Sequence, residues 1–238
     1  MDSGHNTPAF GPQHVLLVGP TGCGKTRLVR ELGRLIDTPI ATCSATNLVE
    51  VGYSGEHVDS VVHRLLHAAE GDVRRAERGI IFIDEIDKKR RVSGISRDVS
   101  GEVVQQSLLK LMDGAKVAIR REDETMMVST RGILFVCAGA FPGIEQILDS
   151  HHQHGSLGFA CIQGDPDTGT LELDGHGALV EFGMIPELLG RFTTVARLRP
   201  LTLNELERVL SDSKASVIHS TQAFAARHGA KISVSKGD

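Results

Sequence analysis

The chain has 238 residues, a formal net charge of −4 and a 40% share of hydrophobic residues, enough for the core of one large domain. The slightly acidic balance provides no basic surface for a phosphate backbone, so we expect no nucleic-acid partner. No apolar run approaches membrane-spanning length, and the first residues lack the basic-then-apolar pattern of a secretory signal. We therefore expect no membrane partner and a cytoplasmic location, or an organelle matrix in a eukaryote.

The first strong signal is a loop that fits the pattern G-x-x-x-x-G-K-[ST] without a mismatch. The apolar run 15–18 before it predicts a buried strand, and the apolar spacing within 25–36 predicts a helix after it. Strand, glycine loop and helix together are the context of a phosphate-binding loop, whose backbone N–H groups and helix N-terminus face phosphate oxygens. The loop consists of Gly19, Pro20, Thr21, Gly22, Cys23, Gly24, Lys25 and Thr26.

Two residues of this loop have predicted chemical roles. Lys25 can reach the β- and γ-phosphates of a nucleoside triphosphate, and the Thr26 hydroxyl can ligate Mg²⁺. The alternative is a plain glycine turn between a strand and a helix. The complete motif in its full context favours the phosphate site.

Short apolar strands alternate with amphipathic helices over the first part of the chain, which predicts an α/β fold. The expected architecture is a P-loop NTPase with a mostly parallel sheet between layers of helices. The predicted strands are 15–18, 39–43, 79–83 and 133–137, and the predicted helices are 25–36, 56–69 and 102–112.

The remaining segments suggest an insertion, a long loop and a change of structure near the C-terminus. Residues 115–131 read as a hairpin, and the polar stretch of about 150–172 reads as a loop. Two helices, about 202–211 and 213–228, end the chain. We expect a loose segment at 1–12, a large ATPase domain at 13–200, and only the start of a small helical domain at 201–238.

An acidic pair completes the predicted nucleotide site. Asp84 and Glu85 follow the apolar run 79–83, and the ends of parallel strands are where ligands bind in open α/β folds. Asp84 is placed to hold the Mg²⁺ shell with Thr26, and Glu85 is placed to polarise a water for attack on the γ-phosphate. A solvated strand end is the alternative, and the phosphate loop upstream disfavours it.

Residues 83–88 and the segments that follow them resemble the ClpX family of AAA+ unfoldases. The whole region of similarity runs from about residue 14 to about residue 225. The resemblance implies an ATP-dependent chaperone that hydrolyses ATP, with Mg²⁺, to move unfolded or tagged polypeptides into a ClpP-like protease. It also implies a ring, either a homo-hexamer or a mixed assembly. The segments that carry it beyond the ATPase motifs are 52–56, 96–102, 104–111, 139–141 and 182–191.

The resemblance implies three further sites. Gly52, Tyr53, Ser54 and Gly55 match a pore loop, in which an aromatic side chain between glycines grips the substrate. Leu157, Gly158 and Phe159 match the loop that docks on the protease, and apolar anchors in a polar loop suit a partner pocket. Arg191 stands where the family has an arginine finger, which acts on the γ-phosphate of the neighbouring subunit.

Each site has a plain alternative: a tyrosine in a turn, a loop folded back on the body, and an arginine at a helix end. The chain also lacks the family's zinc-binding cysteine pairs and most of its small helical domain, and Ala138 occupies the first sensor region. A second function therefore stays open. The chain can be a shortened, non-catalytic ClpX-like interaction protein that binds nucleotide and modulates a protease or a full-length ring.

Overall fold

The computed structural model describes residues 13–49, 56–91, 99–121, 124–154, 174–211 and 216–233. The chain divides into two compact units, Met1–Leu198 and Arg199–Asp238.

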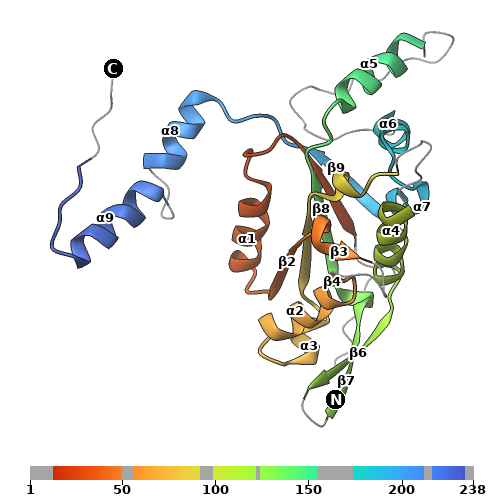
Figure 1. The fold of residues 1–238 in the computed structure, drawn as a ribbon, viewed down its shortest axis with the longest axis horizontal. Helices are drawn as coiled ribbons and strands as arrows, with labels where there is room; N and C mark the ends of the chain where they lie inside the picture. Colours follow the sequence, from red (N-terminus) through yellow and green to blue (C-terminus); the bar gives the residue numbers. More distant parts are fainter. Residues whose placement is uncertain are drawn as a thin grey trace, which may run out of the picture. The chain divides into compact units, whose positions relative to one another are not determined.

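A five-stranded parallel sheet forms the centre of the first unit (Figure 1). Its strand order is β2-β5-β8-β1-β9, which confirms the predicted α/β fold with a parallel sheet. Four of the strands were predicted from their apolar runs, and the edge strand β9 was not. The strands are β1 (His14–Val18), β2 (Ile40–Ser44), β5 (Ile80–Asp84), β8 (Leu134–Gly139) and β9 (Phe192–Arg197).

Alternate residues of the strands point to opposite faces of the sheet, and each face has its own core. Leu16 and Val18 belong to the larger core, whereas Leu17 belongs to the smaller one. Helix α1 (Lys25–Leu35) packs Val29 into the smaller core. The larger core is covered by α2 (Ser60–Ala68), α4 (Val99–Met112), α6 (Asp174–Phe182) and α7 (Pro186–Leu189).

Helix α1 confirms the predicted helix, although the apolar residues that predicted it do not face the core. Leu28, Leu32, Leu35 and Ile36 are exposed, while Val29 and Gly33 are buried. Gly33 packs closely against Ile40: a Cβ there would lie 2.0 Å from Ile40 Cδ1, so a larger residue would force the Ile40 side chain to move. The spacing of the apolar residues thus predicted the helix but not the side that packs on the sheet.

The predicted hairpin is confirmed, and the structure corrects the expected bounds of one helix and one loop. Strands β6 (Lys116–Arg121) and β7 (Glu124–Ser129) pair antiparallel, as expected for 115–131. The helix expected at 56–69 begins only at Ser60, because Glu56–His57 forms strand β4 beside β3 (Leu48–Val49). Residues 150–154, expected in a loop, extend α5 (Ile144–His154), and α3 covers Val73–Ala76.

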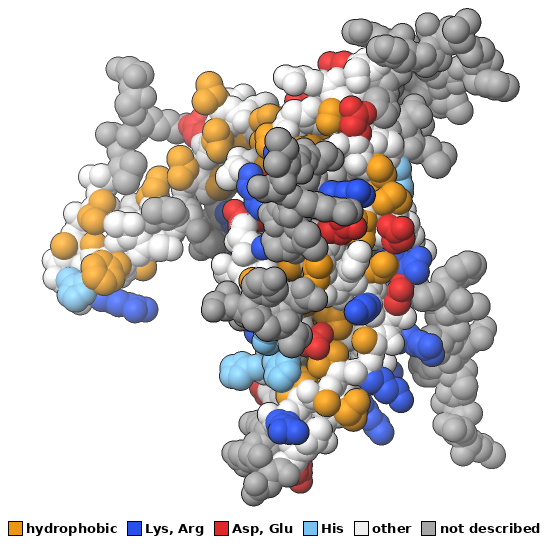
Figure 2. Space-filling model, turned by 45° about the vertical axis from the view of Figure 1, so that its right-hand side comes forward, with side chains coloured by type: hydrophobic (Ala, Val, Ile, Leu, Met, Phe, Trp, Pro, Cys, Tyr) orange, Lys and Arg blue, Asp and Glu red, His pale blue; other side chains and the backbone are white. Residues whose placement is uncertain are grey.

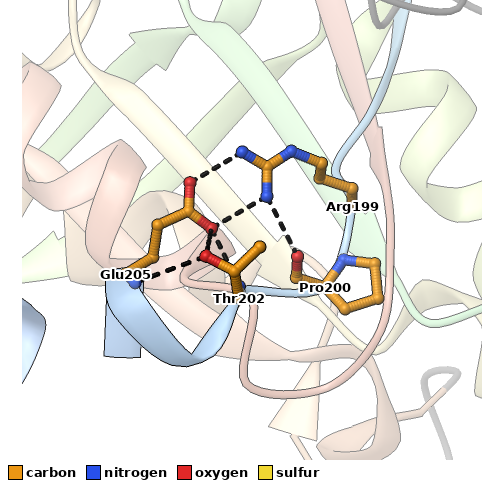
Figure 3. A network of polar contacts seen from close by, with 4 residues as sticks. All are labelled: Arg199, Pro200, Thr202 and Glu205. Carbon is orange, nitrogen blue, oxygen red and sulfur yellow. Dashed lines mark hydrogen bonds and ion pairs between the residues drawn. The ribbon is translucent and has the colours of Figure 1, made fainter. Parts of the chain in front are cut away.

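The second unit contains α8 (Leu203–Ser211) and α9 (Val217–Arg227), close to the two helices predicted there. A capping box starts α8: the Thr202 N–H donates to Glu205 Oε2 (2.9 Å) and the Glu205 N–H donates to Thr202 Oγ1 (3.3 Å). Arg199 holds the same carboxylate with two hydrogen bonds of 2.6 and 2.8 Å (Figure 3). Together these contacts lower the pKa of Glu205 to about 2, the Arg199 hydrogen bond being the largest cause.

Both units expose charged and hydrophobic side chains. Acidic and basic side chains are interspersed on the face of the first unit that Figure 2 displays. Exposed hydrophobic side chains stand along α8 and α9 of the second unit (Figure 2). They are Leu203, Leu206, Val209, Leu210 and Phe224. Within the described part of the chain, no helix has the length and apolar character to cross a membrane.

Candidate functional site

The glycine-rich loop connects the end of β1 to the start of α1. Gly22 and Gly24 have φ angles of 86° and 96°, a backbone conformation that residues with a Cβ rarely adopt. A Cβ at either position would meet no atom within 4 Å, so these glycines are required by backbone conformation and not by crowding. The loop therefore curls back on itself immediately before the N-terminus of an eleven-residue helix.

The base of the loop is fixed by the two strands that flank β1. The Gly19 N–H donates to the carbonyl of Gly139, the last residue of β8 (3.1 Å), and the N–H of Leu198, which follows β9, donates to the Val18 carbonyl (2.7 Å). A Cβ at Gly19 would lie 2.5 Å from the Leu198 carbonyl oxygen, which leaves no room for a side chain. The sheet thus holds the loop at the carboxyl edge of its strands.

Lys25 points into the loop and not into solvent. Its side chain is 8% exposed, and its ammonium donates to the carbonyls of Gly19 (2.7 Å) and Pro20 (2.9 Å). Two neutral carbonyls are weak partners for a cation compared with an anionic phosphate, because charge-assisted hydrogen bonds are stronger. This ammonium is therefore placed for a phosphate group held by the loop.

Thr26 and Asp84 lie side by side. The Thr26 hydroxyl donates to Asp84 Oδ2 at 2.9 Å, which joins the first turn of α1 to the last residue of β5. Hydroxyl and carboxylate oxygens are the ligand types that Mg²⁺ takes in nucleotide sites, with phosphates and water completing its shell. The pair fits the predicted Mg²⁺ site, and its position beside the loop is the one that a metal between protein and phosphates requires.

Glu85 leaves the strand with an unusual backbone conformation. Its φ and ψ of 58° and 34° lie in the left-handed region, which is uncommon for a residue with a side chain. Its N–H donates to Asp84 Oδ1 (2.9 Å), and its carboxylate accepts a hydrogen bond of 2.5 Å from Ser44 Oγ. The two acidic residues thus have separate environments: Asp84 faces Thr26, and the exposed Glu85 faces Ser44.

Ser44 and Asp87 also lie at the site and were not predicted from the sequence. Ser44 ends β2, and it reaches Glu85 because β2 and β5 are neighbours with Ser44 paired to Asp84. Asp87 is 3% exposed, and its carboxylate accepts a hydrogen bond of 3.3 Å from the Ala140 N–H. The signal available for Ser44 was its position directly after the predicted strand 39–43. Ala138, assigned to the first sensor region, is fully buried in the smaller core.

Arg191 lies at the opposite edge of the sheet from the phosphate loop. It immediately precedes β9, and β9 runs parallel to β1 with Phe192 beside His14 and Arg197 beside Val18. The five residues of β1 lie between the two edges, and the four steps from the first to the last, at about 3.3 Å each, span about 13 Å. Arg191 is therefore not brought together with Lys25, Thr26, Asp84 and Glu85 of its own chain.

The segments 52–55 and 157–159, assigned to the pore loop and the docking loop, lie outside the described residues, as does 1–12. The described part of the site therefore comprises the phosphate loop, the acidic pair and the polar residues around them.

Residues 12–195 match the AAA domain (Cdc48 subfamily). The chain belongs to this AAA family. The matched range contains the phosphate loop, the acidic pair and Arg191, so all of the candidate site residues lie within the AAA domain. The parallel sheet and its flanking helices agree with this assignment.

Within the AAA family, the chain is similar to ClpX proteins. The chain is 42% identical over 234 residues to the ATP-dependent Clp protease ATP-binding subunit ClpX of Porphyromonas gingivalis, covering 92% of this chain and 57% of that protein. ClpX 2 of Wolinella succinogenes is 38% identical over 238 residues (96% of this chain, 58% of that protein), and ClpX of Borrelia duttonii is 42% identical over 220 residues (86% and 51%). The chain thus resembles ClpX over nearly all of its own sequence. It spans a little more than half the length of these relatives.

Proposed function

We propose that this AAA chain is the nucleotide-hydrolysing part of a ClpX-like unfoldase subunit that uses ATP and Mg²⁺ to move polypeptides into a ClpP-like protease. The observation that carries the proposal is the convergence of Lys25, Thr26, Asp84 and Glu85 at one edge of the sheet. The names of the ClpX relatives, which describe ATP-binding subunits of an ATP-dependent protease, support the choice of nucleotide.

Each residue has a separate task in this proposal. The backbone of the glycine loop and the Lys25 ammonium bind the phosphates, and Lys25 exchanges its bonds to Gly19 and Pro20 for phosphate oxygens. Thr26 and Asp84 hold Mg²⁺, which neutralises charge on the β- and γ-phosphates when bound. Glu85 orients a water and accepts its proton during attack on the γ-phosphorus, once the carboxylate turns from Ser44.

The position of Arg191 supports a site completed by a second subunit. Because it lies at the far edge of the sheet from its own phosphate loop, we propose that its guanidinium acts on the γ-phosphate of a neighbouring chain. A guanidinium supplied in this way stabilises transition-state charge and raises kcat by about a thousandfold or more. We therefore propose a ring, in which each interface contains Glu85 from one subunit and Arg191 from the next.

The mechanical part of the proposal rests on residues outside the described structure. Tyr53 is the proposed substrate-gripping side chain, and Leu157–Phe159 is the proposed protease-docking tripeptide. Tyr53→Ala is expected to preserve ATP turnover but lose unfolding of a tagged fluorescent protein. Phe159→Ala is expected to preserve turnover but lose co-sedimentation with ClpP. Unchanged co-sedimentation would remove the docking role.

A complementation experiment tests the hydrolytic part. Glu85→Gln and Arg191→Ala chains are each expected to bind ATP but not to hydrolyse it above background. When the two are mixed, sites that take Glu85 from one variant and Arg191 from the other are expected to restore turnover. If neither the wild type nor the mixture hydrolyses ATP, the non-catalytic alternative is favoured.

A further inference from the structure

Arg191 is paired with a carboxylate from a distant part of its own chain. Its Nε donates to Asp113 Oδ1 in a short, direct contact between residues 78 positions apart. Among the described residues, no acceptor takes a hydrogen bond from the two terminal nitrogens of Arg191. The Asp113 carboxylate thus holds one edge of the guanidinium and leaves the other edge available.

Asp113 stands where its own helix disfavours a negative charge. It immediately follows α4, and its N–H still donates to the Leu109 carbonyl (2.9 Å) as part of the last helical turn. The C-terminus of a helix carries a partial negative charge, so a carboxylate there is unfavourable unless a cation compensates it. Arg191 is that cation, and the Asp113 carboxylate in turn raises the pKa of the guanidinium.

The backbones that carry both partners are fixed to the start of β1. The Phe135 N–H donates to His14 Nδ1 (3.2 Å), so the imidazole hydrogen is on Nε2, which donates to the Met112 carbonyl (3.3 Å) next to Asp113. On the other side, Thr193 Oγ1 donates to the His14 carbonyl (3.2 Å) two residues after Arg191. His14 therefore sets the distance between the end of α4 and the start of β9.

We propose that Asp113 is a positioning residue for Arg191, holding its Nε so that the terminal nitrogens project toward the nucleotide of a neighbouring subunit. This inference rests on the proposed role of Arg191 in hydrolysis by that neighbour. Asp113 itself touches neither the nucleotide nor the attacking water. It acts by fixing the orientation of a long side chain that otherwise samples many rotamers, and misplacement of a catalytic group is costly in rate.

If the Asp113–Arg191 ion pair served only stability, its loss would have a small effect. The two side chains are 44% and 47% exposed, and exposed ion pairs contribute little to stability. Glu145 and Arg197 form a comparable exposed pair at the other end of β9, with Oε1 and Nη2 2.6 Å apart. Glu145→Gln therefore serves as the matched control for the loss of an ion pair on the same strand.

The test places Asp113→Asn in one or the other chain of the complementing mixture of Arg191→Ala and Glu85→Gln. In the Glu85→Gln chain, which supplies Arg191, we expect Asp113→Asn to lower the restored turnover about tenfold, with the KM for ATP unchanged within about twofold. In the Arg191→Ala chain the same substitution is expected to have no effect. Asp113→Glu in the Arg191-supplying chain retains the carboxylate and is expected to recover most of the turnover.

The outcomes separate this inference from the function on which it rests. The positioning role alone is overturned if Asp113→Asn leaves the restored turnover unchanged in both chains. It is also overturned if Glu145→Gln lowers the restored turnover as much as Asp113→Asn does. A fall of equal size in both chains identifies a structural effect and also overturns it. An absence of turnover in the unmodified mixture overturns the action of Arg191 in a neighbouring site, and the positioning role with it.

Discussion

The Thr26 hydroxyl donates a hydrogen bond of 2.9 Å to Asp84 Oδ2 across 58 residues of sequence. The contact joins the helix that follows the phosphate loop to the strand that carries the acidic pair. In the proposed mechanism these two oxygens form one side of the Mg²⁺ site, and the phosphates of a bound nucleotide supply another side. The dependence of ATP turnover on Mg²⁺ concentration therefore tests the proposed role of this pair.

Thr26→Val keeps the shape of the side chain but removes its hydroxyl. We expect the Mg²⁺ concentration for half-maximal ATP turnover to rise about tenfold or more, because one oxygen ligand is lost. Thr26→Ser retains the hydroxyl and is expected to stay within about threefold of the wild type. A Mg²⁺ titration of turnover measures both. Equal Mg²⁺ dependence of the Val and Ser variants would exclude Thr26 as a ligand.

Gln105 is a buried connection between the turn after β5 and the segment that leads to Arg191. It is fully buried, its amide donates to the Lys89 (2.7 Å) and Gly183 (3.2 Å) carbonyls, and its oxygen accepts from the Ile185 N–H (2.9 Å). Gln105→Leu leaves these buried and half-buried backbone groups without that partner and is expected to lower the free energy of unfolding by about 2 kcal/mol.

The neighbouring Gln106 is exposed and provides the control for Gln105. Gln106→Leu is expected to change the free energy of unfolding by about 0.5 kcal/mol or less. Urea denaturation of both variants gives the comparison. Similar values for the two substitutions would show that the Gln105 hydrogen bonds contribute little.

The lowered pKa of the buried His14 leads us to expect that the free energy of unfolding depends on pH. Burial lowers the pKa of its imidazole, the Met112 hydrogen bond offsets part of this shift, and the charges of Arg191 and Asp113 oppose each other. The unfolded chain takes up a proton near the ordinary pKa of about 6.5, while the folded imidazole stays neutral to lower pH. The contribution of His14 is thus complete above pH 6.5 and is lost as the pH falls below that value.

We therefore expect the wild type to lose more unfolding free energy between pH 7.5 and 5.5 than His14→Gln, by up to about 1.4 kcal/mol per pH unit below the ordinary pKa. His63→Gln, at an exposed position of α2, is expected to follow the wild type. Urea denaturation at several pH values measures the difference. Parallel curves for the wild type and His14→Gln would contradict a neutral buried imidazole.

The lowered pKa of Glu205 leads us to expect a pH-dependent effect on the start of α8 in the second unit. Because Arg199 and the capping contacts of Thr202 lower the pKa of Glu205 to about 2, its carboxylate should remain ionised at pH 4. Its stabilising effect on the start of α8 is present above the ordinary pKa of 4.5 and is lost as the pH falls toward 2. In an NMR titration, Arg199→Ala is expected to raise the pKa of Glu205. An ordinary pKa in both proteins would show that the network is absent in solution.

The sequence predicted the features that depend on neighbouring residues. The glycine loop, the strand before it and the acidic pair at 84–85 are local patterns, so their positions followed from the strand and helix periods. Strand β9 was missed because only Phe192 and Val195 are buried within an edge strand that also contains exposed and half-buried polar residues. A short strand of this kind has no continuous apolar run.

The contacts between distant segments were not predictable in this way. Ser44 reaches Glu85 only because β2 and β5 are adjacent in the sheet, and strand order cannot be read from periodicity. Asp113 reaches Arg191 because α4 ends beside the start of β9. Arg191 was assigned a role from family resemblance alone, and the sheet register, which places it far from the phosphate loop of its own chain, supports the proposal that this role involves a second chain.

ATP turnover per chain, measured as the protein concentration is raised, tests the central claim most directly. If hydrolysis needs Glu85 from one chain and Arg191 from the next, turnover per chain should rise with concentration to a plateau and stay at background in Glu85→Gln. Turnover that never exceeds the Glu85→Gln background, alone or mixed with a complete ClpX relative, would contradict the account. Turnover per chain that is independent of concentration down to the monomer would contradict the role of the neighbouring subunit.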